Sequence, residues 1–167
     1  RLFPAIPTGM KLPFVHPPFF AALIRPLALL PYPSAFLVWL LVMTGLYLAG
    51  FSLVLGSCER IATGDRWIAL LLGLSFHPFA FDCLLGGQAS SIGFLAMAVA
   101  LLCERSGLHF GLGLALGLCL YKPPLLLLII PLLAVARRWR ALVGFAATGL
   151  VLVSLSLLAV GLRGCLA

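Results

Sequence analysis

Apolar runs alternate with short polar or proline-containing segments along the whole chain. Two of these runs are long and uncharged, the first of about 22 residues from Ala35 to Gly56 and the last from Ala141 to Leu162. About 20 apolar residues in a helix cross the hydrocarbon core of a bilayer. The pattern therefore predicts a transmembrane helix at each place.

Four shorter apolar runs lie between the long ones, at residues 67–76, 90–103, 108–121 and 125–136. Backbone that leaves a helix at membrane depth must be buried in protein or line a wet cavity, so short helices need neighbours. We predict an all-α fold: one domain over residues 1–167, forming a polytopic transmembrane bundle with about six transmembrane segments in residues 35–162.

Residues 1–18 contain five prolines, which predict an extended or coiled loop. Pro18 suits the first turn of a short helix from Phe19 to Leu30. At about 12 residues this helix is roughly 18 Å long, too short to cross the bilayer. We expect it to be re-entrant or interfacial and extracytoplasmic, with Arg25-Pro26 kinking it and Ser34 capping the next helix. Arg25 fits either a snorkelling side chain or a ligand contact.

Composition places the chain in a membrane, because 63% hydrophobic and 9% charged residues leave too little polar surface for a soluble domain. Mean hydropathy is +1.23. The net charge of +7 does not indicate nucleic-acid binding, since the basic residues are scattered or stand at the ends of apolar runs, where they orient helices or meet anionic lipids. The five cysteines lack metal-ligand spacing and are expected to be apolar fillers.

The arginines predict an orientation. If each run crosses once, the loops at 57–66, 104–107 and 137–140 share one side and hold six arginines. By the positive-inside rule that side is cytoplasmic. The opposite, extracytoplasmic side then receives the polar residues His16, His77, Asp82, Gln88 and Lys122.

Residues 77–88 place a histidine, a carboxylate and an amide between two apolar runs. Pro78 ends or kinks the preceding helix, and Gly86-Gly87 allow a sharp turn. Polar groups at membrane level indicate a functional site. A plain interhelical loop is the alternative, in which an Asp82–Lys122 ion pair ties loops together and His77 caps a helix.

The chemistry of these groups fits a sugar linked to a lipid phosphate. Lysine is a point charge for phosphate, aspartate accepts a proton or holds sugar hydroxyls, and glutamine recognises hydroxyls as donor and acceptor. Phe79 and Phe81 could stack on a sugar ring or contact an isoprenoid tail, although a place in the core is the commoner role of a phenylalanine.

Several motifs follow one another in a characteristic order. They are His16-Pro17-Pro18-Phe19-Phe20, Arg25-Pro26-Leu27-Ala28-Leu29-Leu30-Pro31, Leu85-Gly86-Gly87-Gln88, Tyr121-Lys122-Pro123 and Arg137-Arg138-Trp139-Arg140-Ala141. From about residue 14 to about residue 145 the chain resembles glycosyltransferase family 87, a GT-C-type family of polytopic enzymes that includes polyprenyl-phosphate-mannose-dependent mannosyltransferases.

The resemblance implies transfer of a sugar, mannose or another hexose or pentose, from a polyprenyl-phosphate donor to a hydroxyl of a lipid or glycan acceptor. A carboxylate would deprotonate the acceptor while cations stabilise the leaving phosphate. Lys122 is the first candidate for the phosphate contact and Arg25 the second. Gln88 and Asp82 would hold sugar or acceptor, His16 could do either, and no metal or cofactor is expected.

The chain also departs from the family pattern. His16 stands where the family more often has tyrosine, and Ser90-Ser91 replaces an expected asparagine. The family's catalytic acidic residue lies upstream of the Pro-Pro helix, and residues 1–13 contain no Asp or Glu. With no initiator methionine, we expect an internal fragment that lacks this residue and could be inactive.

Two rival classes remain open from the sequence, a polytopic transporter and a non-catalytic membrane fragment. Transporters of this kind usually show an internal repeat and polar residues within their spans, and neither is evident. The expected location is a bacterial plasma membrane, crossed several times, with the active face extracytoplasmic and membrane lipids as neighbours.

Overall fold

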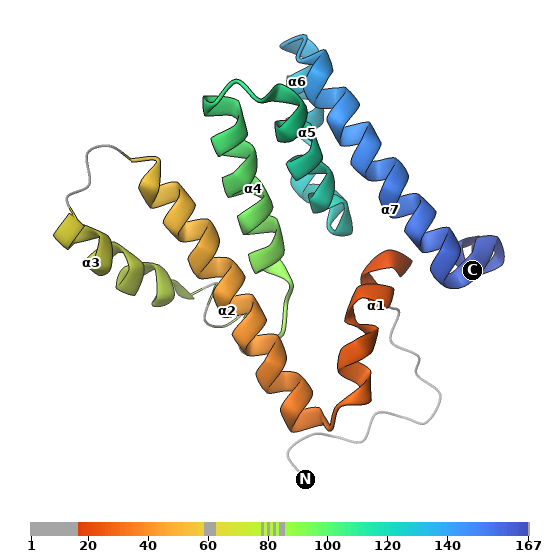
Figure 1. The fold of residues 1–167 in the computed structure, drawn as a ribbon, viewed down its shortest axis with the longest axis horizontal. Coiled ribbons are helices and arrows are strands. Elements are labelled where there is room, and N and C mark those ends of the chain that lie inside the picture. Colours follow the sequence, from red (N-terminus) through yellow and green to blue (C-terminus); the bar gives the residue numbers. More distant parts are fainter. Residues whose placement is uncertain are drawn as a thin grey trace.

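The computed structural model of the protein describes residues 17–58, 63–77, 79, 81, 83 and 86–166. All regular elements within these ranges are helices, and no strand is found among them (Figure 1). The all-α prediction is therefore confirmed for this part of the chain. Two helices are long and apolar enough to cross a membrane, Tyr32–Gly56 and Trp139–Gly161, and the number of crossings stays a prediction.

The N-terminal helix is broken where the sequence predicts. Helix α1 runs Pro18–Ile24, with proline in its first turn, and continues as the 3-10 helix η1, Arg25–Leu29. The break falls at Arg25 because Pro26 cannot donate the helical hydrogen bond that continues an α-helix.

The predicted cap of the next helix is wrong. Helix α2 is Tyr32–Gly56, and its N-cap is Pro31, without a side-chain cap. Ser34 therefore lies inside the first turn. Pro33 is tolerated there because the first turn of a helix leaves its N–H groups without intrahelical partners.

The remaining helices are short until the last. They are α3 (Thr63–Leu74), α4 (Ser90–Arg105), α5 (His109–Gly117), the 3-10 helices η3 (Leu118–Tyr121) and η4 (Pro123–Leu126), α6 (Ile129–Val135) and α7 (Trp139–Leu166). Two consecutive prolines end η3, since a residue before proline avoids the α conformation, and Lys122 accordingly has φ −137° and ψ 75°. Gly161, with φ 69°, breaks α7 near its end.

Helices α5 and α7 pack most extensively of all pairs, and small residues permit their close approach. A Cβ on Gly113 would lie 1.8 Å from the Ala141 carbonyl oxygen, and one on Gly144 would lie 2.2 Å from that of Phe110. Such small-residue contacts are typical of helices that associate within membranes. The same seam contributes to a core shared by α4, α5 and α7.

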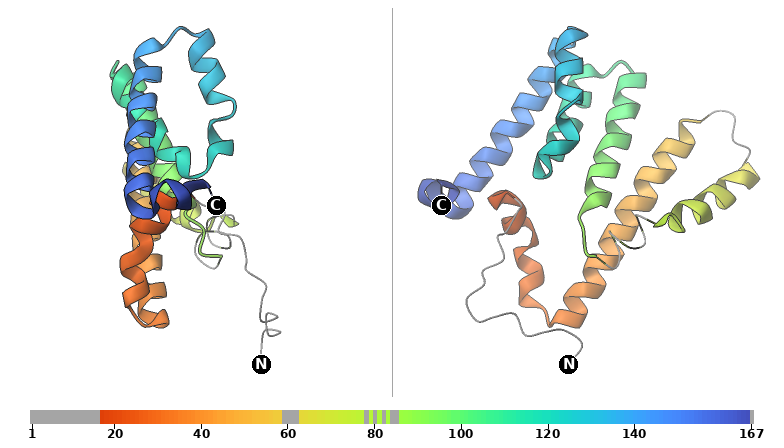
Figure 2. Two further views of the ribbon diagram at one scale, coloured as in Figure 1. Left: turned by 90° about the vertical axis from the view of Figure 1, so that its right-hand side faces the viewer. Right: turned by 180° about the vertical axis from the view of Figure 1, so that it is seen from behind.

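The connections gather at two opposite ends of the bundle. The α4–α5 and α6–α7 turns lie at one end (Figures 1 and 2). Arg105 donates to the Ser57 carbonyl oxygen, which brings the end of α2 to the same place. The start of α4 and the end of η3 lie at the other end, toward α1. The described parts of the arginine-rich turns therefore lie together at one end of the bundle, as the sequence predicts.

Candidate functional site

Gln88 and Lys122 meet at the end of the bundle near α1. Lys122 Nζ donates to Gln88 Oε1 at 3.4 Å, although 34 residues separate them. Ser90 Oγ is 3.5 Å from the same oxygen. Gln88 is exposed and Lys122 half-buried. The structure thus brings together two of the predicted site residues from separate loops.

A glycine forms the turn that carries Gln88. Gly87 has φ 67°, the left-handed conformation that favours glycine. The Gly86 N–H donates to the Phe81 carbonyl oxygen at 2.7 Å, which returns the chain toward α4. The side chain of Gln88 is therefore presented just before the helix begins.

Tyr121 fixes Lys122 against this turn. Its ring is 3% exposed, and its hydroxyl donates to the Ala89 carbonyl oxygen at 2.9 Å and accepts the Gly93 N–H at 3.2 Å. The ring also stacks on Phe20, with centroids 5.6 Å apart. A buried hydroxyl needs hydrogen-bond partners. Here one partner, Ala89, directly follows Gln88, and the other, Gly93, lies in the first turn of α4. The hydrophobic pattern does not predict this role, although the position of Tyr121 at the end of an apolar run is a signal that could have indicated it.

A cavity of about 950 Å³ lies beside the turn, between α1, η1 and α2. Gly87 and Ala89 form one wall, and Arg25 contributes the cationic side chain of the lining. Apolar and aromatic residues, among them Phe20 and Trp39, form most of the rest. An amphipathic ligand with an anionic group fits this lining. We refer to this space as the first cavity.

Other predicted residues lie apart from this pair. The His77 ring stacks on Phe81 with centroids 4.3 Å apart, and within the described ranges it forms no hydrogen bond with Gln88 or Lys122. Phe79 is buried and stacks on Tyr47 at 3.7 Å, as a core residue does. His16 and Asp82 lie outside the described residues, so their roles stay predictions.

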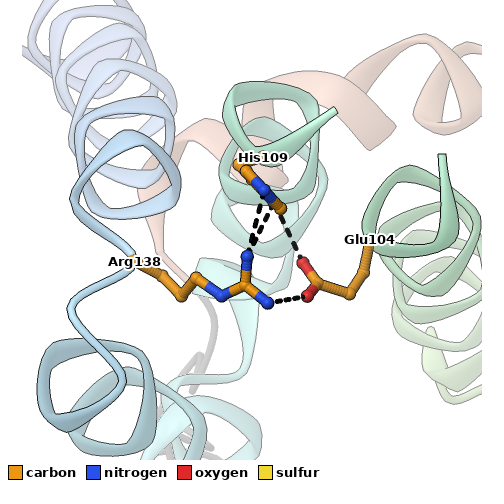
Figure 3. Close-up of polar contacts among 3 residues, drawn as sticks. All are labelled: Glu104, His109 and Arg138. Carbon is orange, nitrogen blue, oxygen red and sulfur yellow. Dashed lines mark hydrogen bonds and ion pairs between the residues drawn. The ribbon is translucent and has the colours of Figure 1, made fainter. Parts of the chain in front are cut away.

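A second polar cluster lies at the opposite end (Figure 3). Arg138 Nη2 donates to Glu104 Oε1 at 2.6 Å, and Arg138 Nη1 lies 3.0 Å from His109 Nε2. His109 Nδ1 is 3.2 Å from Glu104 Oε2. The three side chains come from α4, α5 and the residue before α7, so their mutual contacts tie these elements together. The sequence placed the arginines at this end but did not predict the pairing.

The described part of the chain contains no group of three His, Cys, Asp or Glu side chains that could hold a metal ion. Its free cysteines are Cys58, Cys83, Cys103 and Cys119. Cys83 and Cys119 are buried, as expected of small apolar fillers.

The chain matches a known protein family. The family model described as glycosyltransferase family 87 matches residues 14–165. The match includes Arg25, Gln88 and Lys122 and extends through most of α7. No curated protein and no solved structure matches the chain.

Proposed function

The chain belongs to glycosyltransferase family 87, and on this basis we propose that it transfers a sugar from a polyprenyl-phosphate donor to an acceptor hydroxyl. The sugar would be mannose or another hexose or pentose, and the acceptor a lipid or glycan. Family membership and the two long apolar helices indicate a membrane glycosyltransferase. The donor, the acceptor and the extracytoplasmic location are the proposed parts.

The observation that carries the proposal is the contact between Lys122 and Gln88. An ammonium group has three donors, and this contact uses one of them at a long 3.4 Å. Gln88 is exposed, and no described residue hydrogen-bonds its amide nitrogen. Both side chains therefore keep the capacity to bind a ligand, the lysine through phosphate and the glutamine through a sugar hydroxyl.

The first cavity supports a lipid-linked donor. Its apolar wall suits an isoprenoid chain, and Arg25 adds a cation to the lining. Gly87 and Ala89, which flank Gln88, belong to the same wall. A donor could therefore place its chain against Phe20 and Trp39 while its phosphate lies toward the cationic side chains. Arg25 forms no hydrogen bond with Gln88 or Lys122 within the described ranges, so a bound ligand would link them.

The proposed step breaks the bond between the sugar carbon and the donor phosphate. The phosphate leaves with the electron pair, and nearby cations stabilise that charge. The acceptor oxygen bonds to the sugar carbon and releases its proton to a carboxylate base. Gln88 and Lys122 supply binding and charge stabilisation in this scheme.

Replacement of the lysine tests the proposal. Lys122→Gln should reduce kcat/KM for donor by about 10- to 100-fold, since hydrogen bonds to charged groups contribute about 1.5 to 3 kcal/mol. Lys122→Arg should retain part of the activity. Arg140→Gln removes an exposed cation at the opposite end and serves as the matched control. Unchanged kcat/KM in Lys122→Gln would show that the lysine is only an interface anchor.

A further inference from the structure

The turn that carries Gln88 lies between two cavities. Gly87 and Ala89 line the first, whereas Ser90 and Ser91 line another of about 690 Å³. This second cavity lies between α2, α3 and the first turns of α4. Adjacent residues of one short segment thus line two separate spaces, and the boundary between them falls between Ala89 and Ser90. Gln88 lies next to this boundary, and its Oε1 contacts Ser90 Oγ.

The second cavity differs from the first in charge. Among the described residues its lining contains no Asp, Glu, Lys or Arg, and aromatic residues contribute much of it: Tyr47, Phe51, Phe76, Phe79 and Phe94. Aromatic faces bind apolar chains and the apolar faces of sugar rings. The described lining therefore suits a neutral ligand, whereas Arg25 in the first cavity suits an anionic one.

Most polar groups of the second cavity already have partners. The Tyr47 hydroxyl donates to the Gly73 carbonyl oxygen at 2.8 Å, and Ser91 Oγ lies 3.0 Å from Cys83 Sγ. Ser90 is the exception, because within the described part of the chain its hydroxyl makes only the long 3.5 Å hydrogen bond to Gln88 Oε1. A ligand hydroxyl at this edge would thus meet the Ser90 hydroxyl and the Gln88 amide together.

We propose that the second cavity binds the acceptor substrate, a neutral amphipathic molecule with an apolar chain and a hydroxyl-bearing head at the Ser90 edge. The inference rests on the proposed function, because a transferase must hold two substrates on opposite sides of the bond that is exchanged. The charge difference assigns them, with the anionic donor in the first cavity and the neutral acceptor in the second. Gln88 then lies where the two heads meet.

Photocrosslinking of the protein in lipid nanodiscs tests this assignment. The probes are an alkyl glycoside and a polyprenyl phosphate, each with a diazirine in its chain, and the labelled residues are identified by mass spectrometry. We expect the glycoside to label α3 and the start of α4, and the polyprenyl phosphate to label α1 and η1. Glycoside labelling of the first cavity would contradict the proposal. Equal labelling of the second cavity by a diazirine phosphatidylcholine would contradict it too, since bulk lipid would then fill the space.

Two matched substitutions sharpen the test, because each replaces an alanine by a phenylalanine in one cavity and so reduces the volume of that cavity. Ala69→Phe lies in the second cavity and Ala28→Phe in the first. Ala69→Phe should lower glycoside labelling about tenfold and leave polyprenyl-phosphate labelling unchanged, and Ala28→Phe should do the reverse. Loss of both labels in Ala69→Phe with an unchanged melting temperature would overturn the assignment.

The test of the acceptor cavity can fail independently of the test of the proposed contact between Lys122 and the donor. Lys122→Gln should weaken polyprenyl-phosphate labelling and leave glycoside labelling intact. If Lys122→Gln has no effect while Ala69→Phe removes only glycoside labelling, the donor contact is wrong and the acceptor cavity stands. If Ala69→Phe leaves glycoside labelling unchanged, the assignment of the acceptor to the second cavity is wrong, whatever the effect of Lys122→Gln.

Discussion

The two polar ends of the bundle use their charged groups differently. Glu104, His109 and Arg138 form a closed set of contacts between 2.6 and 3.2 Å, in which the carboxylate meets both a guanidinium and an imidazole. Gln88 and Lys122 share one contact of 3.4 Å. Helix α4 separates the two ends by about 24 Å, the rise of 16 residues.

The difference indicates which end binds a ligand. Each oxygen of the Glu104 carboxylate already has a short partner on a different element, so the Glu104 cluster ties helices together. The half-buried ammonium of Lys122 uses one of its three hydrogen-bond donors within the described residues. Residues on either side of its partner Gln88 line the two cavities. Only 9% of the residues in the chain are charged. The position of Lys122, with one long hydrogen bond and apolar cavities nearby, therefore favours a ligand-binding role.

The largest expected difference between the ends is their accessibility from the two sides of the membrane. Cysteines placed at Lys122 and at Arg140 should be labelled from opposite sides of intact cells, because the arginine-rich turns are predicted to be cytoplasmic. An impermeant maleimide should label position 122 alone, after replacement of native cysteines. Equal labelling of both positions would contradict the orientation.

The next largest effect is expected at Tyr121. Tyr121→Phe keeps the stack on Phe20 but removes the hydroxyl, leaving the Ala89 carbonyl and the Gly93 N–H without it. We expect a loss of about 1 to 3 kcal/mol in stability and a raised KM for donor, because the Gln88 turn is released. Denaturation and kinetics on the same preparation measure both. An unaltered KM would mean that the hydroxyl supports the fold alone.

Gln88→Ala should act on binding rather than on the fold. Gln88 is exposed, so the loss of its amide should leave thermal stability unchanged. Transfer should fall by about tenfold, corresponding to one lost hydrogen bond of about 1.4 kcal/mol to a sugar hydroxyl. A native transfer rate in Gln88→Ala would show that this turn does not belong to the active site.

Glu104→Gln should produce the smallest effect, and on stability alone. The side chains of the cluster are 29 to 40% exposed, so solvent screens their attraction. A loss of less than about 1 kcal/mol is expected. Transfer activity should stay native after correction for folded protein. A specific loss of donor affinity would place the cluster in the active site and remove the contrast between the two ends.

Local rules predicted much of the fold. Apolar runs located the helices, and prolines located the break at Arg25 and the end of the helix before Lys122. Ser34 failed as a cap because the neighbouring prolines let the helix begin three residues earlier than expected, at Tyr32. Arginine placement also predicted that Gln88 and Lys122 lie on one side, and the structure adds that they touch.

Tertiary packing determined what the sequence could not. The partners of the Tyr121 hydroxyl lie 28 and 32 residues away, at Gly93 and Ala89. The pairing of Glu104 with Arg138 spans 34 residues and depends on the close approach of α5 to α7. Both cavities are formed by helices distant in sequence, so no local pattern indicates them.

The most direct measurement is the affinity of the protein in nanodiscs for a polyprenyl phosphate, compared between the native protein, Lys122→Gln and Arg138→Gln. Lys122→Gln should weaken binding by about 10- to 100-fold at native stability, because it removes the cation expected to meet the phosphate. Arg138→Gln should lower stability and leave the affinity of the folded protein native. Native affinity in Lys122→Gln, or equal loss in both variants, would contradict the assignment of the donor phosphate to the Gln88–Lys122 end.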